Sequence, residues 1–188
     1  MIQQNKILPF ALALFFLLTC PNMLLGQTKI DSIVSLGDDL MNLEDYKQAQ
    51  NTYERALEMK ASYIPALRGN IEVLMAINKY GRAEKAASQA LEKHPENPAF
   101  YMYKGKALIE QGRFKKALPP LDKSLNFAGS QDSTIIHRVY VNRGAAYQKL
   151  GNNSKALENY SKALSINRDN PNVFIYRGNL YYRQKKYQ

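Results

Sequence analysis

The chain has 188 residues, 45% of them hydrophobic, with 13 tyrosines and no tryptophan, which is typical of one folded domain and argues against a disordered chain. Its formal net charge of +10 is uneven: nine basic and eleven acidic residues in 27–97 give −2, whereas sixteen and five in 98–188 give +11. The asymmetry favours an anionic partner for the C-terminal half, although basic residues on outer helix faces would also serve solubility alone.

The first predicted element is a targeting segment at the N-terminus. Lys6 precedes an apolar run, Ile7–Leu18, interrupted only by Pro9. The run is shorter than the roughly 20 apolar residues that a membrane-spanning helix needs. A basic head before a short apolar run is typical of a secretory signal, so we expect residues 1–26 to be a signal peptide or anchor.

Three outcomes for this segment remain open. Cleavage after Gly26 would leave Gln27 as the mature start. The run Leu17–Cys20 resembles a bacterial lipobox, in which the cysteine is acylated and attaches the protein to a membrane. An uncleaved anchor through Leu25 is the third. Each predicts an exported, bacterial protein of the periplasm, outer membrane or medium. Cys20 is the only cysteine, which excludes an internal disulfide.

A register of small residues with a period of about 34 follows from Ile30 onward. A glycine is followed after twelve and then seven further residues by alanine or serine, at Gly37/Ala49/Ala56, Gly105/Ala117/Ser124 and Gly144/Ala156/Ala163. Ala83 and Ala90 keep the spacing from Ile71, which replaces the glycine. This period predicts stacked helical hairpins, with small residues where the helices of each hairpin cross.

The boundary residues agree with this period. Asn97-Pro98 and Asn170-Pro171 each predict a helix start, with the asparagine as N-cap and the proline in the first turn. The extra segment Asp132–Ile136 is expected to lengthen the following helix, with Asp132 or Ser133 as its cap. The predicted units are residues 30–63, 64–97, 98–131, 137–170 and a partial unit, 171–188.

The register resembles the tetratricopeptide repeat family across residues 30–188. The family's glycine, alanines and aromatics are matched by Gly37, Tyr46, Ala49, Tyr53 and Ala56 in the first unit, with similar sets in the others. The resemblance implies an all-α fold: a right-handed α-solenoid of antiparallel helix hairpins, about four and a half repeats long. We expect the last repeat to be truncated, or else its exposed aromatics to dock on a partner.

The resemblance also implies where a ligand would bind, because the first helix of each hairpin lines the concave groove in this family. The expected groove residues carry apolar groups and single charges, with acids toward the N-terminal end and bases toward the other. They are Asp38, Met41, Arg68, Glu72, Met75, Met102, Lys106, Ile109, Arg138, Val141, Gln148, Asn179 and Tyr182. Val34, Ala145 and Ile175 share this register. The Lys, Asn and Arg set with which chaperone-binding members hold a carboxylate is not matched.

The sequence contains no pattern that indicates catalysis. His94 and His137 are far apart, and no metal-ligand cluster, phosphate-binding glycine loop or nucleophile–base pair is present. We therefore expect no enzyme, no cofactor, no metal and no nucleic-acid partner. The favoured function is a protein–protein interaction scaffold of the cell envelope that binds a peptide or partner helix in the groove. The alternative is the extracytoplasmic sensory or docking arm of a larger receptor or enzyme.

Overall fold

The computed structural model describes residues 21–129 and 131–186, which form nine α-helices and no strand. Residues 1–20, and with them the expected lipidation site Cys20, lie outside the described residues. Within the described ranges, no helix combines the length and the apolar character that crossing a bilayer requires.

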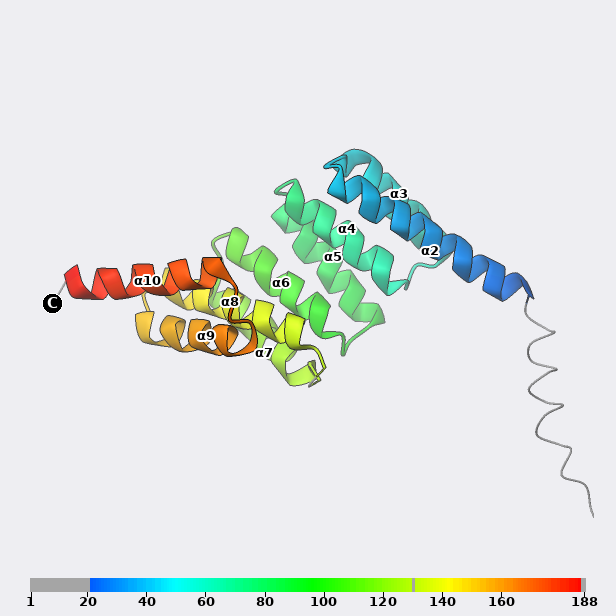
Figure 1. Cartoon of the computed structure of the whole chain (residues 1–188). Helices are drawn as coiled ribbons and strands as arrows, with labels where there is room; N and C mark the ends of the chain where they lie inside the picture. Colours follow the sequence, from blue (N-terminus) through cyan, green and yellow to red (C-terminus); the bar gives the residue numbers. More distant parts are fainter. Residues whose placement is uncertain (1–20, 130, 187–188) are drawn as a thin grey trace, which may run out of the picture.

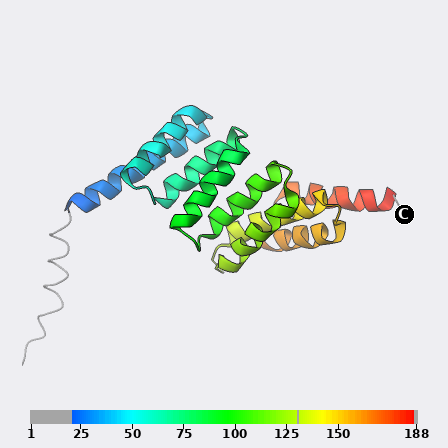
Figure 2. The ribbon, with the colours of Figure 1, turned by 180° about the vertical axis from the view of Figure 1, so that it is seen from behind.

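The helices form antiparallel hairpins that stack side by side into an elongated array (Figures 1 and 2). The first helices of the hairpins are α2 (Pro21–Asn42), α4 (Ile64–Ala76), α6 (Pro98–Glu110), α8 (Ser133–Lys149) and α10 (Pro171–Lys186). The second helices are α3 (Tyr46–Met59), α5 (Tyr80–Lys93), α7 (Phe114–Phe127) and α9 (Asn153–Ile166). The prediction of an all-α solenoid is confirmed.

The contacts between helices arrange the array in two layers, one of first helices and one of second helices. Each second helix packs on the first helix of its own hairpin and on the first helix of the next one. In addition, neighbouring first helices touch one another, at α2–α4, α4–α6 and α6–α8. The first helices therefore form a closely spaced row along one face of the array, and this row positions the candidate site.

The predicted helix starts are confirmed by their caps. The Asn97 side chain accepts hydrogen bonds from the backbone N–H groups of Ala99 and Phe100, and Asn170 caps α10 in the same way. The extra residues before the fourth hairpin lengthen α8 to 17 residues, compared with 13 in α4 and α6. Asp132 is its N-cap residue, but its carboxylate accepts from the Gly129 N–H and not from the helix.

All four hairpin turns use the same backbone conformation at the same place. Glu44, Asn78, Gly112 and Gly151 each lie in the left-handed region, with φ between 58° and 78°. Glycine adopts this conformation without the steric cost that a Cβ atom brings, so the third and fourth turns are better suited to it than the first. The turn geometry is thus a property of the repeat and not of one residue type.

The atoms nearest to the glycines of the first helices do not belong to the alanines twelve residues later, with which we expected the glycines to meet. Each lies instead against a large side chain sixteen residues later, on the second helix of the same hairpin: Gly37 against Tyr53, Gly105 against Leu121 and Gly144 against Tyr160. A Cβ atom at Gly105 would be 2.5 Å from Leu121 Cγ. The alanines Ala49, Ala117 and Ala156 are fully buried.

The second hairpin reverses this pair. Ile71 occupies the glycine position, and the residue sixteen later is Ala87; both are buried in the same core cluster. A large residue on the first helix is therefore matched by a small one on the second, which keeps the core filled. The ring of Tyr53 also lies against Gly69 of α4, so this glycine, which the sequence analysis did not single out, sets the spacing between the first two hairpins.

This pairing predicts that a larger side chain on one helix of a hairpin is tolerated only when the facing side chain on the other helix becomes smaller. Gly105→Ala should lower the free energy of unfolding by about 1–3 kcal/mol, because its Cβ overlaps Leu121. The double variant Gly105→Ile/Leu121→Ala, which copies Ile71 and Ala87, should lose less than the sum of its single substitutions. Urea unfolding followed by circular dichroism measures both.

Gly81→Ala is the matched control. Gly81 is helical, with open space where a Cβ would stand, so the substitution should stabilise α5 by up to about 1 kcal/mol. A change in stability at Gly105 that equals the change at Gly81 would show that a Cβ atom fits at Gly105, and close packing would not explain this glycine.

Candidate binding groove

The row of first helices contains a cavity of about 750 Å³ near the C-terminal end of the array. Its walls come from α6, α8 and α10, and it is closed by residues of α7 and α9. The lining includes Lys106, Ile109, Val141, Gln148, Lys149 and Tyr176. Four of the expected groove residues, and Ala145 of the same register, are thus brought together in one hollow.

The cavity combines an apolar wall with basic side chains. Ile109, Phe114 and Val141 supply apolar surface, and Lys106 and Lys149 supply two positive charges against the single carboxylate of Glu110. The Tyr160 ring packs against Tyr176 with 5.6 Å between centroids, and its hydroxyl donates to Gln148 Oε1 at 2.8 Å. This arrangement suits an apolar side chain that is flanked by a carboxylate.

Three charged or polar side chains connect the first helices in the middle of the row. The Tyr103 hydroxyl of α6 donates to the Glu72 carboxylate of α4. Arg138 of α8 donates to the same hydroxyl at 3.5 Å, and its guanidinium lies over the Tyr103 ring, 5.2 Å from the centroid. Burial, with the nearby Glu72 carboxylate, raises the pKa of Tyr103 to about 12. Two expected groove residues, Glu72 and Arg138, are therefore partners of one tyrosine.

The N-terminal end of the row is organised around a second tyrosine. The Tyr53 hydroxyl donates to Asp38 Oδ1 at 2.5 Å. Burial and this hydrogen bond raise the pKa of Tyr53, with Glu72 acting in the same direction and Arg68 opposing it. The expected residues Asp38, Arg68 and Glu72 thus surround one hydroxyl group, and they give this end a mixed charge.

The remaining expected residues do not join the cavity. Met102 is fully buried in the core, so its prediction as a groove residue is wrong; Val34, of the same register, is buried as well. Met41 and Met75 are half-buried and pack against core clusters. Asn179 and Tyr182 are exposed on α10, as is Ile175.

Tyr176, which lines the cavity, and the buried Tyr103, which contacts Glu72 and Arg138, were not among the expected residues. Both follow the helix-starting proline by five residues, Pro98 and Pro171, so a shared position was visible in the sequence. The expected groove register began one residue earlier and ran along a neighbouring helix face.

Both histidines have structural contacts. His94 ends α5, and its Nε2 lies 2.6 Å from the Ser62 carbonyl oxygen of the preceding loop. His137 is buried; its Nδ1 donates to the Ala163 carbonyl at 3.0 Å, and its Nε2 accepts from the Asn170 amide. Each ring therefore ties a helix to a neighbouring loop or helix.

Models of the tetratricopeptide repeat family match residues 30–63, 70–133 and 137–170, which together are more than half of the chain. The chain belongs to the tetratricopeptide repeat family. The stacked helical hairpins described above are the repeat units that these models match.

Among curated relatives, the type IV pilus assembly protein PilF of Pseudomonas aeruginosa is 25% identical over 84% of this chain and 61% of its own length. Human tetratricopeptide repeat protein 6 is 25% identical over 84% of this chain and 30% of its own. The chain thus spans less than two thirds of these relatives.

Solved structures share the fold. The structure of Pseudomonas aeruginosa PilF superposes with a TM-score of 0.74 at 24% identity, over 86% of this chain and 72% of that one. A tetratricopeptide repeat protein of Thermus thermophilus gives 0.70 at 20% identity, over 82% of each chain.

The raised pKa of Tyr103 predicts a loss of stability at alkaline pH. The folded chain holds this proton up to about pH 12, whereas an unfolded tyrosine releases it near 10, so the stabilisation is present below pH 10 and lost as the pH rises to 12. Tyr103→Phe should be less stable than the parent at pH 7, and the difference should shrink by about 2 kcal/mol between pH 10 and 12. Tyr181→Phe, at an exposed position, is the control; urea unfolding at each pH measures the effect. A constant difference for Tyr103→Phe would contradict it.

Proposed function

We propose that this chain is a non-catalytic scaffold of the bacterial cell envelope, and that it binds an extended peptide or a partner helix along the row of first helices. The observation that carries the proposal is the 750 Å³ cavity, because it unites expected groove residues from α6 and α8 with Tyr176 of α10. A hollow with apolar walls and a few polar groups is the usual form of a binding site.

The charges along the row give the partner its chemistry. The cavity has two lysines and one glutamate, whereas Asp38 and Glu72 lie toward the other end of the row. A bound segment with carboxylates beside its apolar residues would meet Lys106 and Lys149 at the cavity. Complementary charges of this kind fix orientation and speed association more than they add affinity.

The envelope location rests on two further supports. Near the N-terminus, Lys6 precedes a short apolar run, which is typical of an export signal. A relative of similar sequence along most of this chain, PilF, is by its name a type IV pilus assembly protein. A scaffold that helps to assemble an envelope structure fits both features.

Selection of peptides from a displayed library on the folded chain tests the groove. We expect the selected peptides to combine apolar and acidic residues. Lys106→Glu/Lys149→Glu should weaken their binding about tenfold or more, since it replaces attraction by repulsion in the cavity. Fluorescence anisotropy measures the affinity, and raising the salt from about 0.05 M to about 0.5 M should weaken binding to the parent.

Lys115→Glu/Lys116→Glu is the matched control. It makes the same change in net charge at exposed positions of α7 that do not line the cavity. Equal losses in the two double variants would show that net charge alone attracts the peptides, and the groove would not be their site.

The mature N-terminus tests the envelope location separately. In the native host, mass spectrometry should find either a diacylglycerol on Cys20, a peptide that begins at Gln27, or an uncleaved chain in the membrane fraction. A chain that keeps Met1 and is recovered only from the cytosol would remove the envelope assignment while leaving the groove in place.

A further inference from the structure

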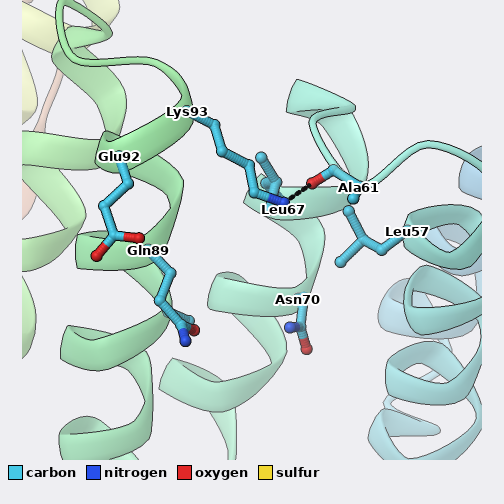
Figure 3. Close-up of a pocket in the computed structure, with 8 residues that line it drawn as sticks. Leu57, Ala61, Leu67, Asn70, Gln89, Glu92 and Lys93 are labelled. Atoms are coloured by element: carbon cyan, nitrogen blue, oxygen red, sulfur yellow. Dashed lines mark hydrogen bonds between the residues drawn. The ribbon is translucent and has the colours of Figure 1, made fainter.

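A second hollow, of about 320 Å³, opens between the second helices α3 and α5 with α4 beneath it (Figure 3). Leu57 of α3 and Leu67 of α4 form part of its wall. Asn70 of α4 and Ala86, Gln89 and Lys93 of α5 also line it. We call this hollow the α3–α5 slot. Lys93 reaches over one end and donates to the Ala61 carbonyl oxygen at 2.7 Å.

The α3–α5 slot faces away from the proposed groove. On α4, the slot residues Leu67 and Asn70 are three positions apart and share one helix face. The groove-side residues Arg68 and Glu72 are rotated from them by more than a quarter turn at 100° per residue. A ligand in the slot would therefore leave the groove free.

The same place is filled by a tyrosine at the next two junctions of the array. Between α5 and α7 the equivalent of Leu67 is Tyr101, which stacks on Phe127 with 5.5 Å between ring centroids. Lys123 of α7 covers that ring at 5.7 Å. Between α7 and α9 the equivalent is Tyr140, covered by Lys162 at 5.8 Å. Two junctions thus hold a phenol ring under a lysine.

The junction between α3 and α5 lacks both the tyrosine ring and the covering lysine, because smaller residues stand at the equivalent positions. Leu67 replaces the tyrosine, Asn70 replaces Lys104 and Arg143, and Ala86 replaces Pro120 and Asn159. Gln89 stands where Lys123 and Lys162 cover their rings. The α3–α5 slot therefore lies where the next two junctions hold the aromatic ring of Tyr101 or Tyr140, and this junction has the smaller Leu67 instead.

A polar atom of one slot residue also lacks a partner. Asn70 Oδ1 is buried and accepts no hydrogen bond from the protein. A buried acceptor without a donor costs free energy, which a donor on a ligand would recover. A phenol hydroxyl is such a donor, whereas a phenylalanine ring has none.

We propose that the α3–α5 slot binds a tyrosine side chain of a partner protein, as the neighbouring junctions bind Tyr101 and Tyr140 of this chain. The ring occupies the apolar space beside Leu57 and Leu67, and the Asn70 side chain turns so that its Oδ1 accepts a hydrogen bond from the hydroxyl. The slot is a second binding surface on the face opposite the groove, and it does not depend on what the groove binds.

Titration of the chain with p-cresol, a small-molecule analogue of the tyrosine side chain, tests the slot directly. Methyl NMR signals of Leu57, Leu67 and Ala86 should shift together, with a Kd on the order of 1 mM for so small a ligand. Toluene, which lacks the hydroxyl, should bind more weakly. Asn70→Ala should reduce p-cresol binding to the level of toluene and leave toluene binding unchanged.

Two variants that change the space of the slot provide the controls. Leu67→Tyr should fill the slot from within and abolish binding of both ligands; if it does not fold, Ala86→Leu fills the same space from α5. Tyr101→Leu should open an equivalent slot between α5 and α7 and create a second set of shifts there.

Two results would overturn the proposal. One is p-cresol binding that is absent from the slot or unchanged in Leu67→Tyr and Ala86→Leu. The other is a dimer, measured by analytical ultracentrifugation, that Leu67→Tyr dissociates, because the slot would then hold a second copy of this chain and not a partner protein.

Discussion

The architecture depends on the close approach of a bare glycine on one helix to a bulky side chain on its neighbour. Gly37, Gly105 and Gly144 allow the two helices of the first, third and fourth hairpins to lie so near that no Cβ atom fits between them. The side chains are closely packed over the whole interface at these crossings. A single added methyl group therefore lowers the free energy of unfolding substantially. Hairpins of this compactness can stack with their first helices in contact, and that contact creates the row in which the groove lies.

The same side chains connect the core to the candidate groove. The rings of Tyr53 and Tyr160 are fully buried, yet their hydroxyls donate to Asp38 and Gln148, which belong to the expected groove register. Each tyrosine thus holds a hairpin together at one end and orients a polar groove residue at the other. Preorganised polar groups lose less entropy when a ligand binds, so core packing contributes to recognition.

Much of the fold follows from local rules that a sequence displays. The period of small residues, the asparagine caps and the proline starts gave the hairpins and the lengthened α8, because each depends on a few adjacent residues. The errors concern contacts across helices. The side chain nearest to Gly37, Gly105 and Gly144 lies sixteen residues away in each case, and Met102 faces the core although it shares a helix register with groove residues. The rotation of a helix about its axis is set by all of its neighbours, so the helix register alone could not separate the buried Met102 from Lys106 and Ile109, which line the cavity.

The reversed pair Ile71 and Ala87 limits how such an array can be rearranged by duplication and recombination of its gene. A breakpoint in the loop between hairpins keeps each large residue with its small partner. A breakpoint in the turn inside a hairpin could join the helix that carries Ile71 to one that carries a tyrosine, and the two bulky groups would collide. The junction after the first hairpin is constrained as well, because Tyr53 needs Gly69 in the helix that follows. The first two hairpins should therefore be inherited as one block.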